Sequence, residues 1–113
     1  MKTEEFEDII LKNAFFEIER TLGAKAEEYA RGDRLSNFKI AATFTGISPE
    51  KVLFIWVMKH IEALKSFVND LDEGQNQPLA RWIEKTRDIT NYMILLEALN
   101  IERFQNEQGK DKP

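Results

Sequence analysis

The sequence predicts an all-α protein, built as a bundle of three long helices plus one short helix. Apolar residues recur at intervals of three and four through most of the chain, which is the spacing of one helix face. Glycine, proline and capping residues interrupt this spacing at a few points and so mark helix ends. No segment alternates apolar and polar residues as a half-buried strand does. We therefore expect helices and no sheet.

The first long helix is expected to begin at Thr3, which can cap it, and to end at Gly32. Glu4 and Glu5 follow the cap and suit the positive end of the helix dipole. Gly23 lies inside the segment and costs about 1 kcal/mol relative to alanine, so a bend or a short break can occur there. The apolar residues at helical spacing are Phe6, Ile9, Ile10, Phe15, Ile18, Leu22, Ala26 and Tyr29.

The short helix is expected from about Asn37 to Thr45, where Gly46 stops it. The sequence SPE at 48–50 then starts the next long helix, because serine caps a helix and proline favours its first position. This helix is expected to reach about Leu71. Its first half is apolar on nearly every side, which predicts burial all round. Its second half narrows to a stripe of Ile61, Leu64, Phe67, Val68 and Leu71.

The last long helix follows a polar loop, DEGQNQ at 72–77, and Pro78 fits its first turn. It is expected to continue to about Phe104. Its predicted buried side is formed by Leu79, Trp82, Ile83, Ile89, Met93, Leu96 and Leu99. A length of 113 residues fits one domain, so we expect a single helical domain over 1–105 and a frayed polar tail over 106–113.

Composition narrows the classes of function. A net charge of −4 and a pI of about 5.1 give no overall basic field, so duplex nucleic acid is not an expected partner. The longest apolar run, at 52–58, is far shorter than the roughly 20 residues that span a bilayer, so no membrane is expected. The chain has no cysteine, which excludes disulfides, thiolate ligands and cysteine nucleophiles. Its acidic N-terminus lacks the apolar core of a signal peptide, so we expect a cytoplasmic protein.

The first candidate site is a group of oxygen ligands on the last helix. Glu84, Asp88 and Asn91 recur at helical spacing and so lie close together. With Glu27 or Glu28 of the first helix they can hold Mg²⁺, which takes hard oxygen donors. The alternative is a solvated surface on which nearby basic side chains neutralise the carboxylates, namely Arg81, Lys85 and Arg87.

The second candidate site is a group of phosphate contacts. His60, the one histidine of the chain, follows Lys59, and Arg34 can join this pair. The alternative for His60 is a buried, hydrogen-bonded structural histidine. Asn37 is either a ligand contact or part of the start of the short helix. Tyr92 either stacks on a base or is a core residue with its hydroxyl at the edge.

Several segments resemble a known group of proteins. They are KAEEYA and DRLSNFKIAATFTGISPE, then MKHIEAL, then RDITNYMILLEAL. Together they are similar to small helical proteins of phages and prophages, namely the nucleotide-modification-associated domains and, more distantly, the MazG-like all-α nucleotide pyrophosphohydrolases. The resemblance covers roughly Lys25 to Leu99. It implies a nucleotide or cyclic nucleotide ligand, Mg²⁺ as cofactor, and the host cell cytoplasm as the location of a phage-encoded protein.

In the MazG-like enzymes a glutamate pair, a further glutamate one turn later, and a late glutamate and aspartate three apart hold Mg²⁺. Glu27 and Glu28 match the pair, and Asp88 matches the late aspartate. Arg31 stands where the further glutamate would fall, and Lys85 stands three residues before Asp88. Basic residues at these places oppose metal binding. This difference from the MazG-like pattern therefore favours a non-catalytic protein over an enzyme.

Two functions stay open at this point. The leading hypothesis is a phage-type nucleotide-binding protein, either a MazG-like Mg²⁺-dependent pyrophosphohydrolase or a non-catalytic protein that sequesters a host-defence signalling nucleotide. Its metal candidates are Glu27, Glu28, Glu84 and Asp88, and its ligand candidates are Arg34, Asn37, Lys59, His60, Asn91 and Tyr92. The alternative is a protein-interaction module, such as an inhibitor or an assembly adaptor. Under either hypothesis we expect a homo-oligomer, because few helices this rich in large apolar residues leave a patch to cover.

Overall fold

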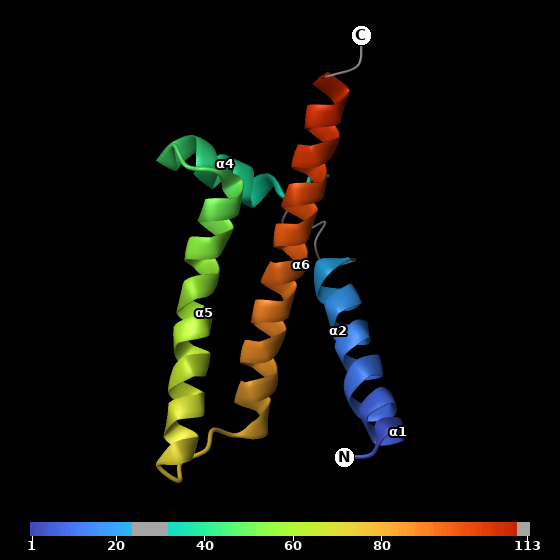
Figure 1. Cartoon of the computed structure of the whole chain (residues 1–113), viewed down its shortest axis with the longest axis vertical. Helices are drawn as coiled ribbons and strands as arrows, with labels where there is room; N and C mark the ends of the chain where they lie inside the picture. The colour runs from blue at the N-terminus through green and yellow to red at the C-terminus, as the bar shows by residue number, and fades with distance from the viewer. Residues whose placement is uncertain (24–31, 111–113) are drawn as a thin grey trace. The chain divides into compact units, whose positions relative to one another are not determined.

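The computed structural model of the chain describes residues 1–23 and 32–110. In this part of the chain every regular element is a helix, so the all-α prediction is confirmed (Figure 1). The chain divides into two compact units, Met1–Arg34 and Leu35–Pro113. Each unit is considered by itself, and the single domain expected from the chain length stays a prediction.

The first unit contains one continuous helix with a change of pitch. α1 (Thr3–Glu5) leads into η1 (Phe6–Leu11), and α2 (Lys12–Leu22) follows. η1 is a π-helix, in which each backbone hydrogen bond spans five residues, as the bond from the Lys12 N–H to the Glu7 carbonyl does. α2 ends next to Gly23, whose N–H bonds to the Glu19 carbonyl.

The π turn explains why the apolar pattern of this helix is continuous. In an α-helix Phe6 and Leu11, five residues apart, would point about 140° away from one another. In a π turn residues five apart lie close to the same side, so Phe6 moves towards the line of Leu11. Phe15, Ile18 and Leu22 continue that line at α-helical spacing. No described residue of this unit is buried.

In the second unit, α4 (Ser36–Thr45) and α5 (Pro49–Asp72) meet at a sharp corner of 102°. Gly46 makes this corner, because its φ of 72° is a left-handed conformation that glycine adopts without strain. Ser48 then caps α5 by accepting a hydrogen bond of 3.1 Å from the Lys51 N–H, and Pro49 occupies the first helical position. Both predicted helix boundaries at this corner are confirmed.

α5 and α6 (Leu79–Lys110) lie side by side and run in opposite directions (Figure 1). The Phe67 and Trp82 rings are 5.5 Å apart near the connecting loop. At the other end of the pair, Arg103 of α6 donates a 2.6 Å hydrogen bond to Glu50 of α5. Glu50, His60 and Phe67 of α5 each contact a residue of α6. Continued at intervals of three and four residues, this contact line also passes through Leu53, Val57, Leu64 and Leu71.

The core of the second unit is small. Its buried apolar residues are Leu35, Phe38, Val52, Leu53, Val57, Phe67, Leu95 and Leu99. The prediction that the first half of α5 is buried all round is wrong, because Phe54 and Ile55 are each 54% exposed. The reason is that α4 and α6 are the described helices that pack on α5, and neither covers the side of these residues.

The last helix is longer than predicted. α6 continues to Lys110, beyond the expected end near Phe104, so residues 106–110 are helical. No proline or glycine interrupts the sequence between Pro78 and Gly109, and Glu102 and Arg103 both form ion pairs with other helices. Fraying of the tail stays a prediction.

Over the described residues, no single helix combines the length and hydropathy needed to cross a membrane. Only α4 and α5 taken together reach that length and hydropathy, and they form the bent pair described above.

Candidate functional site

A polar layer interrupts the apolar contact between α5 and α6 at its middle. His60 on α5 faces Asp88 and Tyr92 on α6. The His60 Nδ1 lies 3.6 Å from the Asp88 Oδ2, and the His60 and Tyr92 rings are 5.5 Å apart. The buried residues Val57 and Leu95 follow one turn away on the same contact lines. The helix spacing that builds the core therefore also places these three partly exposed polar side chains next to it.

The electrostatics of the layer favour an uncharged histidine. Burial lowers the pKa of His60 below its ordinary value of 6.5, and the positive charges of Lys85 and Lys59 act in the same direction. The carboxylates of Asp88 and Glu84 oppose this shift without overcoming it. At neutral pH the imidazole is therefore neutral, with one ring nitrogen donating and the other accepting hydrogen bonds.

The pKa of Tyr92 also differs from its ordinary value, for a related reason. Burial raises the pKa of its hydroxyl above the ordinary value of 10.0, and the negative charge of Asp88 raises it further. The phenol is therefore a stable hydrogen-bond donor at neutral pH.

Two buried polar atoms on α5 and α6 have no hydrogen-bond partner among the described residues. They are the His60 Nδ1 and the Asn91 Oδ1. The distance of 3.6 Å from the His60 Nδ1 to Asp88 is too long for a hydrogen bond. Buried polar atoms normally find a partner, so both atoms offer a hydrogen-bonding position to water or to a ligand.

The structure brings together about half of the predicted site residues. Lys59, His60, Glu84 and Asp88 lie near enough for their charges to affect His60, and Tyr92 contacts its ring. Asn91 belongs to the same stretch of α6. The predicted structural alternative for His60, a hydrogen-bonded core histidine, is met only in part, because the side chain is 14% exposed but its Nδ1 has no described partner.

The other candidates are not part of this layer as described. Glu27 and Glu28 lie outside the described residues, as does Arg31. Arg34 belongs to the first unit, and its convergence with His60 stays a prediction. Asn37 is exposed in the first turn of α4, which starts after Leu35 without a side-chain cap.

A metal site is not assembled within the described residues. Over 1–23 and 32–110, no three histidine, cysteine, aspartate or glutamate side chains come together to hold an ion. Glu84 and Asp88 supply two carboxylates on one helix, whereas Mg²⁺ usually keeps waters and needs near-octahedral geometry. The prediction that joins them with Glu27 or Glu28 stays untested.

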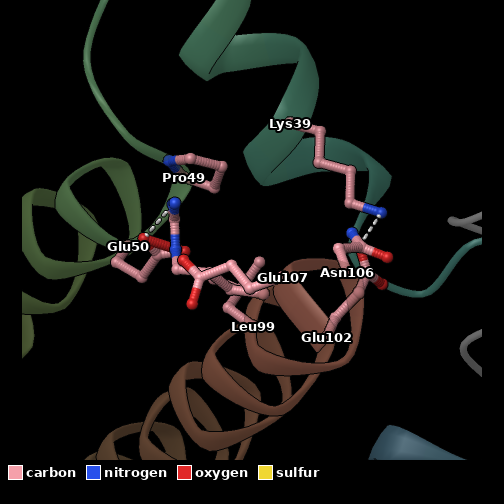
Figure 2. Close-up of a pocket in the computed structure, with 8 residues that line it drawn as sticks. Lys39, Pro49, Glu50, Leu99, Glu102, Asn106 and Glu107 are labelled. Atoms are coloured by element: carbon pink, nitrogen blue, oxygen red, sulfur yellow. Dashed lines mark hydrogen bonds and ion pairs between the residues drawn. The ribbon is translucent and has the colours of Figure 1, made fainter. Parts of the chain in front are cut away.

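A separate cleft of about 260 Å³ lies where α4, the start of α5 and the end of α6 meet (Figure 2). Two ion pairs line it: Lys39 with Glu102 at 2.5 Å, and Arg103 with Glu50 at 2.6 Å. The hydrogen bond from Arg103 to Glu50 raises the pKa of the guanidinium above its ordinary value.

Sequence reasoning did not predict this cleft. Its charged residues are ordinary helix-surface residues along the chain, and only the fold pairs them across helices. The two ion pairs join α4 and α5 to α6, and each of these two cations already has a carboxylate beside it.

No family model, curated protein or solved structure matches this chain. The resemblance to the phage nucleotide-modification-associated and MazG-like proteins therefore stays a prediction.

Proposed function

We propose that the chain is a nucleotide-binding helical protein of the phage type, and that the ligand sits at the polar layer between α5 and α6. The observation that supports the proposal is the convergence of Lys59, His60, Asp88 and Tyr92, together with the unpartnered buried atoms of His60 and Asn91. Aromatic, amide and cationic groups at one place suit the base and the phosphates of a nucleotide.

Each residue type has a role in this proposal. The Tyr92 ring stacks on the base, and the Asn91 Oδ1 accepts a hydrogen bond from a ring or amino N–H of the base. Lys59 contacts phosphate. Glu84 and Asp88 accept hydrogen bonds from the ribose hydroxyls, and they bind Mg²⁺ if Glu27 or Glu28 joins them.

Binding without hydrolysis is the preferred form of the proposal. The positive charge of Lys85 acts on His60 and lies one turn before Asp88 on α6, so it opposes a metal ion at the polar layer. In this form the chain sequesters a signalling nucleotide in the cytoplasm. The proposal also keeps the full bundle of three long helices and one short helix, with the first helix as its third long member, packed on a side of the α5–α6 pair other than that of Phe54 and Met58.

Thermal unfolding tests the proposal. The purified chain is heated with canonical triphosphates, cyclic mono- and dinucleotides, and cyclic products derived from NAD, each with and without Mg²⁺. A ligand at 100 times its Kd adds about 2.7 kcal/mol to the free energy of unfolding. A rise in Tm with the nucleotide recovered intact supports sequestration, and a rise with product formation indicates the pyrophosphohydrolase. If no nucleotide raises Tm, the proposal is wrong.

Matched variants locate the ligand. Tyr92→Ala should weaken binding by about tenfold or more, since base stacking contributes about 1–3 kcal/mol per base, whereas Tyr92→Phe should retain most of it. Ser66→Ala, an exposed change on α5, serves as the control and should leave Kd unchanged.

The second candidate function is a protein-interaction module. It is supported by the amount of apolar surface on the first helix, where Phe6, Phe15 and Phe16 are all exposed. A chain that binds no nucleotide but binds a folded protein partner through this helix would favour this candidate.

A further inference from the structure

The α5–α6 pair has a second apolar side besides the one that joins the two helices. On α5, the residues that directly follow the contact line with α6 point about 100° away from it. They are Lys51, Phe54, Met58, Ile61, Lys65, Val68 and Asp72. The four apolar members of this stripe are all exposed.

α6 contributes to the same side. Its contact line includes Asp88, Tyr92, Leu95 and Leu99, and the residues that directly follow these are Ile89, Met93, Leu96 and Asn100. In two antiparallel right-handed helices, the positions one residue after each contact line turn to the same side of the pair. The stripe of α5 and these residues of α6 therefore form one surface, here called the apolar face.

The opposite side of the pair is mixed. The residues of α5 that directly precede its contact line are polar at Lys59, Ser66 and Asp70, and apolar at Pro49, Val52, Trp56 and Ala63. The Phe38 ring of α4 lies 5.3 Å from the Trp56 ring, so α4 packs on part of this side. The four apolar residues of the stripe, in contrast, are exposed, and a helix pair with an uncovered apolar face can form half of a four-helix bundle.

We propose that a second copy of this chain covers the apolar face, so that two α5–α6 pairs form a four-helix bundle with α5 antiparallel to α5 of the other copy. The charges of the stripe favour this occupant and this direction. Lys51 and Asp72 stand at its two ends, three heptads or about 31 Å apart. In the antiparallel arrangement each Lys51 meets the other copy's Asp72. In a parallel arrangement Lys51, Lys65 and Asp72 would each lie beside the same residue of the other copy, so that like charges would face one another.

The two ends of this surface are complementary to their own reverse. In the same register Lys65 lies level with the other copy's Met58, where its aliphatic stem packs while its ammonium stays in water. This pattern fits a two-fold interface, in which both copies use the same residues. The two-fold axis then passes beside Ile61 on α5 and near Ile89 on α6, because His60 contacts α6 at this level. The face is about 31 Å long and two helices wide, or roughly 600 Å² in projection. This area is of the order of the 800 Å² per partner that stable interfaces bury. The polar layer with His60 and Asp88 lies on the contact lines between the two helices and is not part of the apolar face.

The experiment compares the molar mass of matched variants in solution, by light scattering after size exclusion, from micromolar to millimolar protein. Phe54→Glu introduces a charge into the apolar face, and Phe44→Glu makes the same change on α4, where the ring is 89% exposed. We expect a dimer for the unchanged chain and for Phe44→Glu, and a monomer with unchanged helix content for Phe54→Glu. A monomeric unchanged chain, or a dimer that survives Phe54→Glu, would overturn the proposal.

A second measurement does not depend on a variant that disturbs the core. The chain has no cysteine, so single cysteines can be placed at will. Ile61→Cys places the thiol beside its copy across the two-fold axis, and mild oxidation should yield a disulfide-linked dimer. Ser66→Cys lies on the opposite side of the α5–α6 pair. It is the control and should form no disulfide-linked dimer. Equal coupling of both variants, or none at Ile61→Cys, would contradict the antiparallel arrangement.

Discussion

The His60 Nδ1 and the Asp88 Oδ2 face one another across the α5–α6 contact at 3.6 Å, close enough for electrostatic attraction but too far for a hydrogen bond. Burial nevertheless dominates, and the pKa of His60 is lowered. The imidazole is therefore a half-buried neutral group that the fold does not stabilise in its charged form.

This relationship predicts a dependence of stability on pH. Because the pKa of His60 is lower in the folded chain than the unfolded value of 6.5, the unfolded state binds the proton more readily. The free energy of unfolding should be unaffected by His60 well above pH 6.5. It should fall as the pH drops through 6.5 towards the lowered pKa. Urea unfolding of the chain and of His60→Gln at several pH values measures this. The two curves should diverge in their slope below pH 6.5, and parallel curves would contradict the assignment.

Tyr92 should titrate above its ordinary pKa of 10.0. The chain has two tyrosines, so Tyr29→Phe leaves Tyr92 as the only phenol to follow by ultraviolet absorbance. Asp88→Asn removes the nearby negative charge and should lower the pKa of Tyr92, although burial keeps it above 10.0. An Asp88→Asn variant with an unchanged titration would mean that Asp88 does not act on Tyr92.

Leu53 is the largest fully buried side chain among the described residues. Its side chain is 0% exposed, so Leu53→Ala leaves a cavity and should reduce the free energy of unfolding by about 2–5 kcal/mol. Leu79→Ala makes the same change at a side chain that is 73% exposed and should cost less than about 0.5 kcal/mol. Urea midpoints of the two variants give the comparison. Equal losses would indicate that the core lies elsewhere.

The cap of α5 offers a separate test. Ser48→Ala removes the oxygen that accepts the Lys51 N–H and should cost about 1 kcal/mol. Ser66→Ala removes a serine from the middle of the same helix, where its hydroxyl bonds only to a carbonyl one turn back. This control should change stability little or increase it slightly, since alanine is the better helix former. A loss at Ser66 as large as that at Ser48 would contradict the capping role.

The part of the fold that could be predicted from the sequence depends on local effects of single residues. Gly46, Ser48 and Pro49 fix the corner between α4 and α5 through backbone conformation and capping, and these effects need no tertiary context. The apolar spacing likewise located every described helix. It did not reveal how many neighbours a helix has, and so Phe54 and Ile55 were wrongly expected to be buried.

The sequence predicted which site residues lie together on one helix, but not which residues of two helices meet. The spacing of Glu84, Asp88 and Asn91 placed them together on α6, but the level at which α5 passes them is set by the loop and by packing between Phe67 and Trp82. The meeting of His60 with Asp88 therefore needed the structure. The two ion pairs of the cleft, which join three helices, carry no sequence signal for the same reason.

The π turn at Phe6–Leu11 is a place where the first helix already holds one residue more than an α-helix needs. Deleting a single residue there would convert the turn to regular α-helix and leave Phe6 still in line with Phe15 and Ile18. The same deletion within α2 would rotate everything before it by about 100°. The helix thus has one point at which its length can change by a residue without a change in the surface it presents.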